Sequence, residues 1–165
     1  MGLFDVFKGA KAAEGPVILG AAASGTFVPM KEIPDDVFAK GVLGTCWGIE
    51  PAEGKAYAPV DGTVIQVHDT LHALGLSGPD GTELLVHVGI DTVDMNGEGF
   101  SAKVKEGDKV KKGQLLLTMD LKRIRAAGHP TTVVTVLTNS DDYASQEWIA
   151  EKEVKQGADI LKVSR

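Results

Sequence analysis

The sequence predicts an all-β domain of mainly antiparallel strands, a sandwich or a barrel, with a few short helices. Turn-forming stretches rich in Gly, Pro, Asp and Asn recur along the chain, at 59–62, 78–81, 96–99 and 105–113. Short apolar or alternating runs accompany them, at 63–68, 73–77, 83–88, 100–105, 114–119 and 132–138. Many short strands at this spacing are typical of sandwiches and barrels, and "DILKV" at 159–163 predicts a closing strand.

Two helices are predicted in the C-terminal half. Asp120 can cap a helix over 121–127 that stops at Gly128, because an Asp side chain accepts a hydrogen bond from a free N–H of the first helical turn. Ser140 can cap a second helix over 141–150 in the same way.

Length and charge limit the class of protein. A chain of 165 residues is long enough for one domain with a substantial core. Its 17 Lys and Arg against 23 Asp and Glu give a net charge of −6, which argues against nucleic acid and suits a basic protein partner. The single cysteine, Cys46, excludes an internal disulfide framework. With no signal peptide and no apolar stretch of ~20 residues, we expect a cytoplasmic protein.

The N-terminal segment differs in composition from the rest. Residues 1–13 place Leu3, Phe4 and Phe7 at helical spacing, which predicts either a short amphipathic helix on an anionic membrane surface or a frayed tail. A joint of small residues follows. We therefore expect a flexible segment over 1–23 and a single domain over 24–165.

The stretch 83–91, "ELLVHVGID", predicts a strand with a histidine in its middle. Side chains alternate between the faces of a strand. One face then carries Leu84, Val86, Val88 and Ile90, and we expect it to pack into the core. The other carries Leu85, His87, Gly89 and Asp91. A lone histidine here is compatible with a satisfied core residue as well as with a functional one.

A second segment that contains a histidine favours the functional interpretation of His87. If the chain is extended after Asp69, then Thr70, His72 and Leu74 point the same way. The turn-like "SGPDGTE" at 77–83 makes 71–77 and 82–88 hairpin partners, which would bring His72 within a few ångströms of His87. Neutral imidazole is a nucleophile near pH 7 and suits phosphoryl transfer. No nucleotide-binding motif is present, so another protein would have to deliver the phosphoryl group.

Several motifs together resemble one family. These are "APVDGTV" (58–64), "TLHALGL" (70–76), "ELLVHVGIDTV" (83–93) and "NGEGF" (96–100), supported by 24–44 and 104–121. The chain resembles the glucose-type enzyme IIA of the bacterial phosphoenolpyruvate:sugar phosphotransferase system, in its single-domain form. The resemblance implies an antiparallel β-sandwich with short helices.

It also implies a function and partners. A phosphotransferase component with a phosphohistidine intermediate would take the phosphoryl group from the phosphocarrier HPr. It would pass the group to a cysteine of the IIB domain of a sugar permease. Binding of regulatory proteins would depend on the phosphorylation state, and no cofactor would be required.

The resemblance further implies roles for single residues. His87 would accept the phosphoryl group, His72 would stabilise it, Thr70 would hydrogen-bond within the site, and Asp91 would lie at its edge. Contacts with partner proteins are implied for Val37, Phe38 and Val86.

The chain departs from the family pattern at two places. Where the family usually has Gly-Asp-Gly, this chain reads Gly44, Thr45, Cys46 and then Trp47, and the departure bears on partner specificity. Cys46 is expected to be a small buried thiol. His68 stands where a phenylalanine is frequent, and we expect either a residue at the site entrance or a solvated histidine at a strand end. No role is expected for His129.

Two other functions remain open. His68, His72 and His87 would be the ligands of a zinc-dependent hydrolase, and His72 with His87 can hold adventitious zinc. A biotinyl or lipoyl carrier domain shares the "APVDGTV" pattern, but it needs a lysine at a hairpin tip. The corresponding Lys122 is predicted on a helix.

Overall fold

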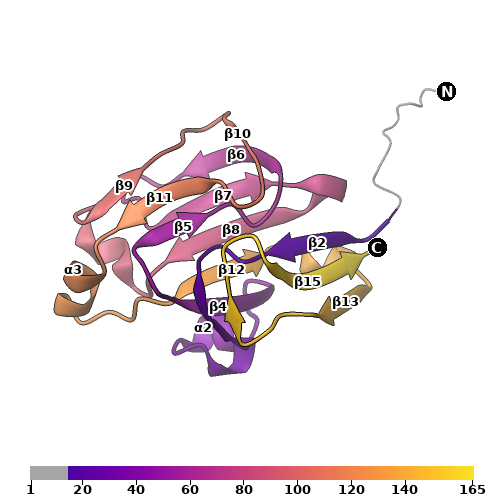
Figure 1. Ribbon diagram of the computed structural model, residues 1–165, viewed down its shortest axis with the longest axis horizontal. Helices are drawn as coiled ribbons and strands as arrows, with labels where there is room; N and C mark the ends of the chain where they lie inside the picture. The colour runs from indigo at the N-terminus through magenta and orange to yellow at the C-terminus, as the bar shows by residue number, and fades with distance from the viewer. Residues whose placement is uncertain (1–14) are drawn as a thin grey trace.

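The computed structural model describes residues 15–165 and consists mainly of antiparallel strands in three sheets (Figure 1). The largest sheet has the strand order β10-β6-β7-β8-β12-β4-β3-β14. Its strands are β3 (Gly25–Val28), β4 (Thr45–Pro51), β6 (Gly62–Val67), β7 (Ala73–Ser77), β8 (Glu83–Val88), β10 (Lys109–Val110), β12 (Val133–Leu137) and β14 (Glu153–Val154).

Two three-stranded sheets cover one face of this large sheet. One has the order β5-β11-β9 and is formed by β5 (Lys55–Tyr57), β9 (Phe100–Ala102) and β11 (Leu115–Met119). The other has the order β13-β15-β2 and is formed by β2 (Val17–Gly20), β13 (Ser145–Trp148) and β15 (Asp159–Ser164). Buried residues of all three sheets share one apolar core, including Leu74, Val86, Leu116 and Ile160. The fold is therefore the antiparallel β-sandwich with short helices that the resemblance implies.

The opposite, outer face of the large sheet carries a second, smaller apolar cluster. Strand alternation sends Leu84 and Val86 of β8 into the main core, whereas Leu85 packs against the second cluster. The cluster's buried members are Ile33, Phe38, Cys46, Ile90, Val134 and Val136. Ile33 and Phe38 come from the segment that holds η1 (Met30–Glu32) and α2 (Asp36–Ala39), at the bottom of Figure 1. This segment forms one side of the site described below.

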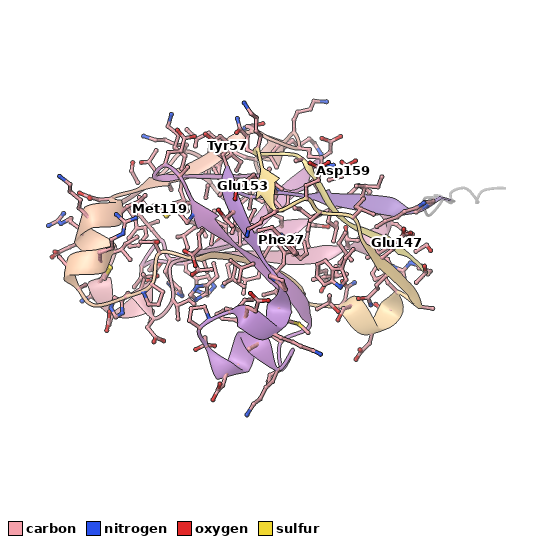
Figure 2. All side chains as sticks on the ribbon, turned by 60° about the horizontal axis from the view of Figure 1, so that its bottom comes forward. Phe27, Tyr57, Met119, Glu147, Glu153 and Asp159 are labelled. Atoms are coloured by element: carbon pink, nitrogen blue, oxygen red, sulfur yellow. The ribbon has the colours of Figure 1, made fainter. Side chains whose placement is uncertain are left out.

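Strand β14 forms one edge of the large sheet and pairs with β3, and Figure 2 labels one residue of each. Phe27 of β3 and Glu153 of β14 lie near each other there, in agreement with the pairing of Glu153 with Thr26. The Glu153 carboxylate accepts a hydrogen bond from the Thr26 hydroxyl (2.9 Å), so this short edge strand is held by side chains as well as by backbone.

Most predicted elements are confirmed, with small differences at their ends. β7 and β8 have the predicted bounds and pair as a hairpin, and β6, β11, β12 and β15 differ from prediction by one residue at one or both ends. β9 is shorter than predicted and ends at Ala102. The predicted helix is α3 (Leu121–Ala126), and the Asp120 carboxylate accepts a hydrogen bond from Arg123 N (3.2 Å) as expected of a cap.

The helix predicted over 141–150 is wrong. Only one 3-10 turn, η4 (Ser140–Asp142), forms before the chain extends into β13 and pairs with β15. The Ser140 hydroxyl does not cap its own helix, because it accepts a hydrogen bond from Thr45 N (3.0 Å) in β4. The Ser140 hydroxyl, on which the helix prediction relied, is thus used in a long-range hydrogen bond with β4.

The predicted boundary between 23 and 24 is also wrong. Residues 17–20 form β2, which pairs with β15, and Ala21, Ala22 and Ala23 are fully buried. The folded region therefore includes Val17 and the residues after it. The predicted amphipathic helix over 1–13 lies outside the described residues. Within 15–165, no helix is long and apolar enough to cross a membrane.

Candidate active site

His87 lies near the end of β8, in the middle of the large sheet. Ala73 of β7 and Val134 of β12 stand directly opposite it on the two neighbouring strands. Its side chain is on the outer face and partly buried, whereas Val86 and Val88 are fully buried in the main core. The predicted alternation along this strand is therefore confirmed as far as Val88.

The chain leaves the strand after Val88, which alters two predictions. Gly89 adopts the left-handed conformation (φ 73°), and a Cβ there would collide with the Thr92 methyl group. Ile90 consequently packs in the second cluster and not in the main core as predicted. Val86 has no exposed surface, so its predicted role in partner contact is wrong.

One hydrogen bond determines which nitrogen of His87 carries the hydrogen. His87 Nδ1 lies 2.8 Å from the Gly89 carbonyl oxygen, which can only accept. Burial lowers the pKa of His87, against the raising effects of that carbonyl and of the Asp35 and Asp91 carboxylates. A neutral ring with hydrogen on Nδ1 has its free electron pair on Nε2. His87 Nε2 is therefore a nucleophile at neutral pH.

His72 approaches His87 from the turn between β6 and β7. The two ring centroids are 5.0 Å apart, with an interplanar angle of 75°. Thr70 Oγ1 lies 2.5 Å from His72 Nδ1, so the predicted contact between these two side chains is present. The predicted convergence of His72 on His87 is confirmed.

The way in which the rings meet differs from the prediction. Residues 69–72 form a turn, closed by a hydrogen bond from Leu71 N to the His68 carbonyl (2.8 Å), and are not extended. Leu71 adopts the left-handed conformation (φ 58°), which is rare for this residue type. Leu74 is fully buried and does not share a face with His72. In the hairpin register Ala73, and not His72, stands opposite His87. The turn before Ala73 nevertheless brings the His72 ring to the His87 ring.

Both site histidines are neutral at pH 7. Burial, with repulsion from His87 and His68, lowers the pKa of His72 from 6.5 to about 4. A neutral ring at His72 has one nitrogen that accepts and one that donates a hydrogen bond. The pair thus combines a nucleophilic nitrogen on His87 with a hydrogen-bond donor on His72.

The lowered pKa of His72 predicts a loss of stability in acid. Between the unfolded pKa of 6.5 and the folded pKa of about 4, the unfolded ring binds a proton and the folded ring does not. The free energy of unfolding should therefore fall as the pH drops through this window. Because the ring is partly open to solvent, we expect His72 to account for about 1 kcal/mol between pH 7 and pH 5. Urea unfolding at pH 7 and pH 5 measures this loss of unfolding free energy. Equal losses in wild type and His72→Gln would contradict the prediction.

The segment around α2 places an aromatic ring and a carboxylate beside His87. The Asp35 side chain caps α2 by accepting from Phe38 N (3.1 Å), and the Phe38 ring lies edge-on to His87, 5.3 Å between centroids. Val37 is 46% exposed, but Phe38 only 6%. Asp35 was not predicted as a site residue, although an aspartate three residues before Phe38 is a recognisable helix-cap signal. Asp91, exposed at the start of η3 (Thr92–Met95), supplies the second carboxylate.

Cys46 and Trp47, where the chain departs from the family pattern, are both buried. The Cys46 thiol donates to the Phe38 carbonyl (3.2 Å) behind the site, and Trp47 packs in the main core. Neither residue offers a surface to a partner protein. The expectation of a small buried thiol is confirmed.

Cys46 should be chemically inert in the folded protein. Burial, with a contribution from Asp35, raises the pKa of its thiol to about 12. At about pH 8 the reactive thiolate is then on the order of 10⁻⁴ of the total. We expect iodoacetamide to leave native Cys46 unmodified by mass spectrometry and to alkylate it fully in urea. Rapid alkylation of the native protein would show that the thiol is accessible.

The other two histidines have different positions. The His68 ring contacts the His72 ring, with centroids 5.0 Å apart, so His68 lies at the site, the first of the two alternatives, and is not merely a solvated strand-end residue. His129 Nε2 lies 2.7 Å from Asp94 Oδ1 and takes part in no ring contact with the site histidines.

The zinc and lysine-carrier alternatives fit the geometry poorly. In the described part of the chain, no group of three or more His, Cys, Asp or Glu side chains is arranged to hold a metal ion. A catalytic zinc usually has three protein ligands, and His68, His72 and His87 are not arranged as such a group. Lys122 lies on α3, as predicted, and not at a hairpin tip.

Comparisons with known proteins agree on one family. The family model described as phosphoenolpyruvate-dependent sugar phosphotransferase system, EIIA 1, matches residues 17–143. The glucose-specific EIIA component of Halalkalibacterium halodurans is 41% identical over 162 residues, covering 96% of this chain and 94% of the relative. The glucose permease IIA of Mycoplasma capricolum has a similar structure, with a TM-score of 0.80, 30% identity and coverage of 89% of this chain and 95% of that one.

Longer relatives contain the same region. The glucose-specific EIICBA component of Staphylococcus saprophyticus is 46% identical over 122 residues, which are 74% of this chain and 18% of the relative. A beta-glucoside-specific EIIBCA component of Dickeya chrysanthemi is 42% identical over 140 residues, 85% of this chain and 22% of the relative.

Proposed function

Because this chain belongs to the EIIA 1 family of the phosphoenolpyruvate-dependent sugar phosphotransferase system, we propose that His87 is the residue that carries the phosphoryl group. One observation supports this assignment above the others. The Gly89 carbonyl holds the hydrogen of His87 on Nδ1, which leaves Nε2 free to attack.

The donor is phosphorylated HPr, and the transfer is a displacement at phosphorus. The electron pair of His87 Nε2 forms the new N–P bond, while the bond to the donor's imidazole breaks and its electrons return to that ring. Positive charge develops on the His87 ring as the bond forms. The Nδ1–H bond to the Gly89 carbonyl stabilises this charge. The step needs no cofactor, since both reactants are imidazoles.

His72 stabilises the transferred group. If the Thr70 hydroxyl donates to His72 Nδ1, the neutral His72 ring carries its hydrogen on Nε2. That N–H can donate to a phosphoryl oxygen on the neighbouring His87. Phosphoryl transfer depends mainly on positioning and on donors to the oxygens, so this contact contributes to the onward transfer.

The surroundings of His87 suit a basic partner with an apolar contact. The carboxylates of Asp35 and Asp91 both act on His87, and Val37, in the helix that Asp35 caps, is exposed. A chain of net charge −6 would attract such a partner over a distance. These features suit HPr before transfer.

The acceptor after His87 is a cysteine of a sugar permease IIB domain in the cytoplasm. Relatives whose names combine the A component with B and C components support a partner of this kind. A phosphoryl group on His87 also makes the surface around the site more negative. Regulatory proteins that bind there would therefore distinguish the two phosphorylation states.

Intact mass after incubation with phosphoenolpyruvate, enzyme I and HPr tests the proposal. We expect one acid-labile phosphoryl group per chain, and no change in its uptake from purified phosphorylated HPr when EDTA is present. No added mass, with HPr preparations that phosphorylate a known EIIA component, would refute the function. Loss of uptake in EDTA, restored by zinc, would instead point to a metal-dependent reaction.

A further inference from the structure

His72 contacts two imidazole rings, and only one of these contacts has a role in the transfer described above. Its centroid lies 5.0 Å from that of His87 and 5.0 Å from that of His68. The interplanar angle to His68 is 56°. The three rings form a connected group that begins at the phosphoryl-accepting residue.

The backbone holds His68 firmly in relation to His72. His68 directly follows β6, its N–H donates to the Ala73 carbonyl (3.1 Å), and its carbonyl accepts from Leu71 N (2.8 Å). Both bonds close the turn that carries Thr70 and His72. His68 is partly buried and its ring contacts that of His72, so it is not a free surface side chain. The position of His68 is therefore set by the same turn that aims His72.

The His72 ring has few other restraints. Within residues 15–165, its one side-chain hydrogen bond is to Thr70, at Nδ1. Rotation about the terminal torsion of a histidine is soft, so one bond at one nitrogen leaves the direction of Nε2 loosely determined. A tilted ring contact restricts this rotation, because edge and face contacts between rings have preferred geometries.

We propose that His68 is a positioning residue, whose ring holds His72 so that Nε2 of His72 faces the phosphoryl group on His87. The inference rests on the proposed function for its effect on transfer, but the contact itself exists without phosphorylation. It acts through ring packing and not through a nitrogen of His68. A phenylalanine at the same position should therefore replace it.

Three variants test whether the ring of His68, and not its nitrogens, is what positions His72. His68→Phe keeps a ring of similar shape and removes the nitrogens, and His68→Ala removes the ring. Ile65→Ala is the matched control, since Ile65 is an exposed residue of β6 (53%) that takes no part in the histidine group. Thermal unfolding of all three shows that any change in rate is not a loss of folded protein.

The first measurement is the rate of phosphoryl transfer from each phosphorylated variant to a purified IIB domain. We expect His68→Ala to be roughly three- to tenfold slower at saturation, the range that a ring contact can supply, with an unchanged half-saturating concentration of IIB. His68→Phe and Ile65→Ala should match wild type. A wild-type rate for His68→Ala, an equally slow His68→Phe, or a raised half-saturating concentration at unchanged rate would each overturn the proposal.

The second measurement needs no phosphorylation. Nitrogen-15 NMR of the unphosphorylated protein should show His72 in one tautomer in wild type and His68→Phe, and a mixture in His68→Ala. The same tautomer in all variants would overturn the proposal. If wild type accepts no phosphoryl group, the proposed function fails, while this measurement still decides whether His68 positions His72.

Discussion

His87→Gln is expected to abolish phosphoryl uptake, with a rate below a thousandth of the wild-type rate. The glutamine amide nitrogen has no available electron pair, so no N–P bond can form, whereas its N–H group can still donate to the Gly89 carbonyl that His87 contacts. The fold should therefore be retained. The measurement is incorporation of labelled phosphate from phosphoenolpyruvate through enzyme I and HPr.

His129→Gln is the matched control for this variant. It makes the same chemical change at a histidine that pairs with Asp94 and lies outside the histidine group. We expect wild-type uptake from it. Uptake by His87→Gln at more than a few per cent of the wild-type rate would show that another residue accepts the group.

His72→Gln is expected to accept the phosphoryl group but to pass it on about 100- to 1,000-fold more slowly. Loss of a positioned donor to a phosphoryl oxygen in a partly buried site has an effect of this size. Glutamine can donate, but it cannot keep both the contact with Thr70 and the ring contact with His87. Rapid-quench measurement of transfer from the phosphorylated variant to a IIB domain gives the rate directly.

Thr70→Val provides the graded comparison. It removes the hydroxyl that contacts His72 Nδ1 and leaves both imidazoles in place. Its onward transfer should lie between those of wild type and His72→Gln, at roughly a tenfold loss. A wild-type onward rate in His72→Gln, or complete loss of uptake in that variant, would contradict the role given to His72.

The strands that surround the site could be predicted because their signals are local. The alternation through 84–88 and the turn at 78–81 determine the β7–β8 hairpin, and the structure contains it with the predicted bounds. The strands before residue 62 were not predicted. Val17–Gly20 is four residues long and became a strand only by pairing with β15 at the far end of the chain.

The site was predictable in its histidines and not in its surroundings. His72 and His87 are fifteen positions apart on the two sides of one hairpin, so its pairing brings the two segments together, and the turn at 69–72 completes the contact. Asp35 and Phe38 reach His87 through packing of a distant segment on the outer face of the sheet. The position of His68 depends on the left-handed conformation of Leu71, which no sequence rule assigns to a leucine.

The most direct test of the account is to locate the phosphorus atom on the phosphorylated protein. Nitrogen-15 and phosphorus-31 NMR of the uniformly labelled phosphoprotein shows which ring nitrogen is bonded to phosphorus and to which residue it belongs. The hydrogen bond from His87 Nδ1 to Gly89 predicts a single N–P bond at Nε2 of His87. A phosphoryl group on Nδ1 of His87, or on either nitrogen of His72 or His68, would contradict it.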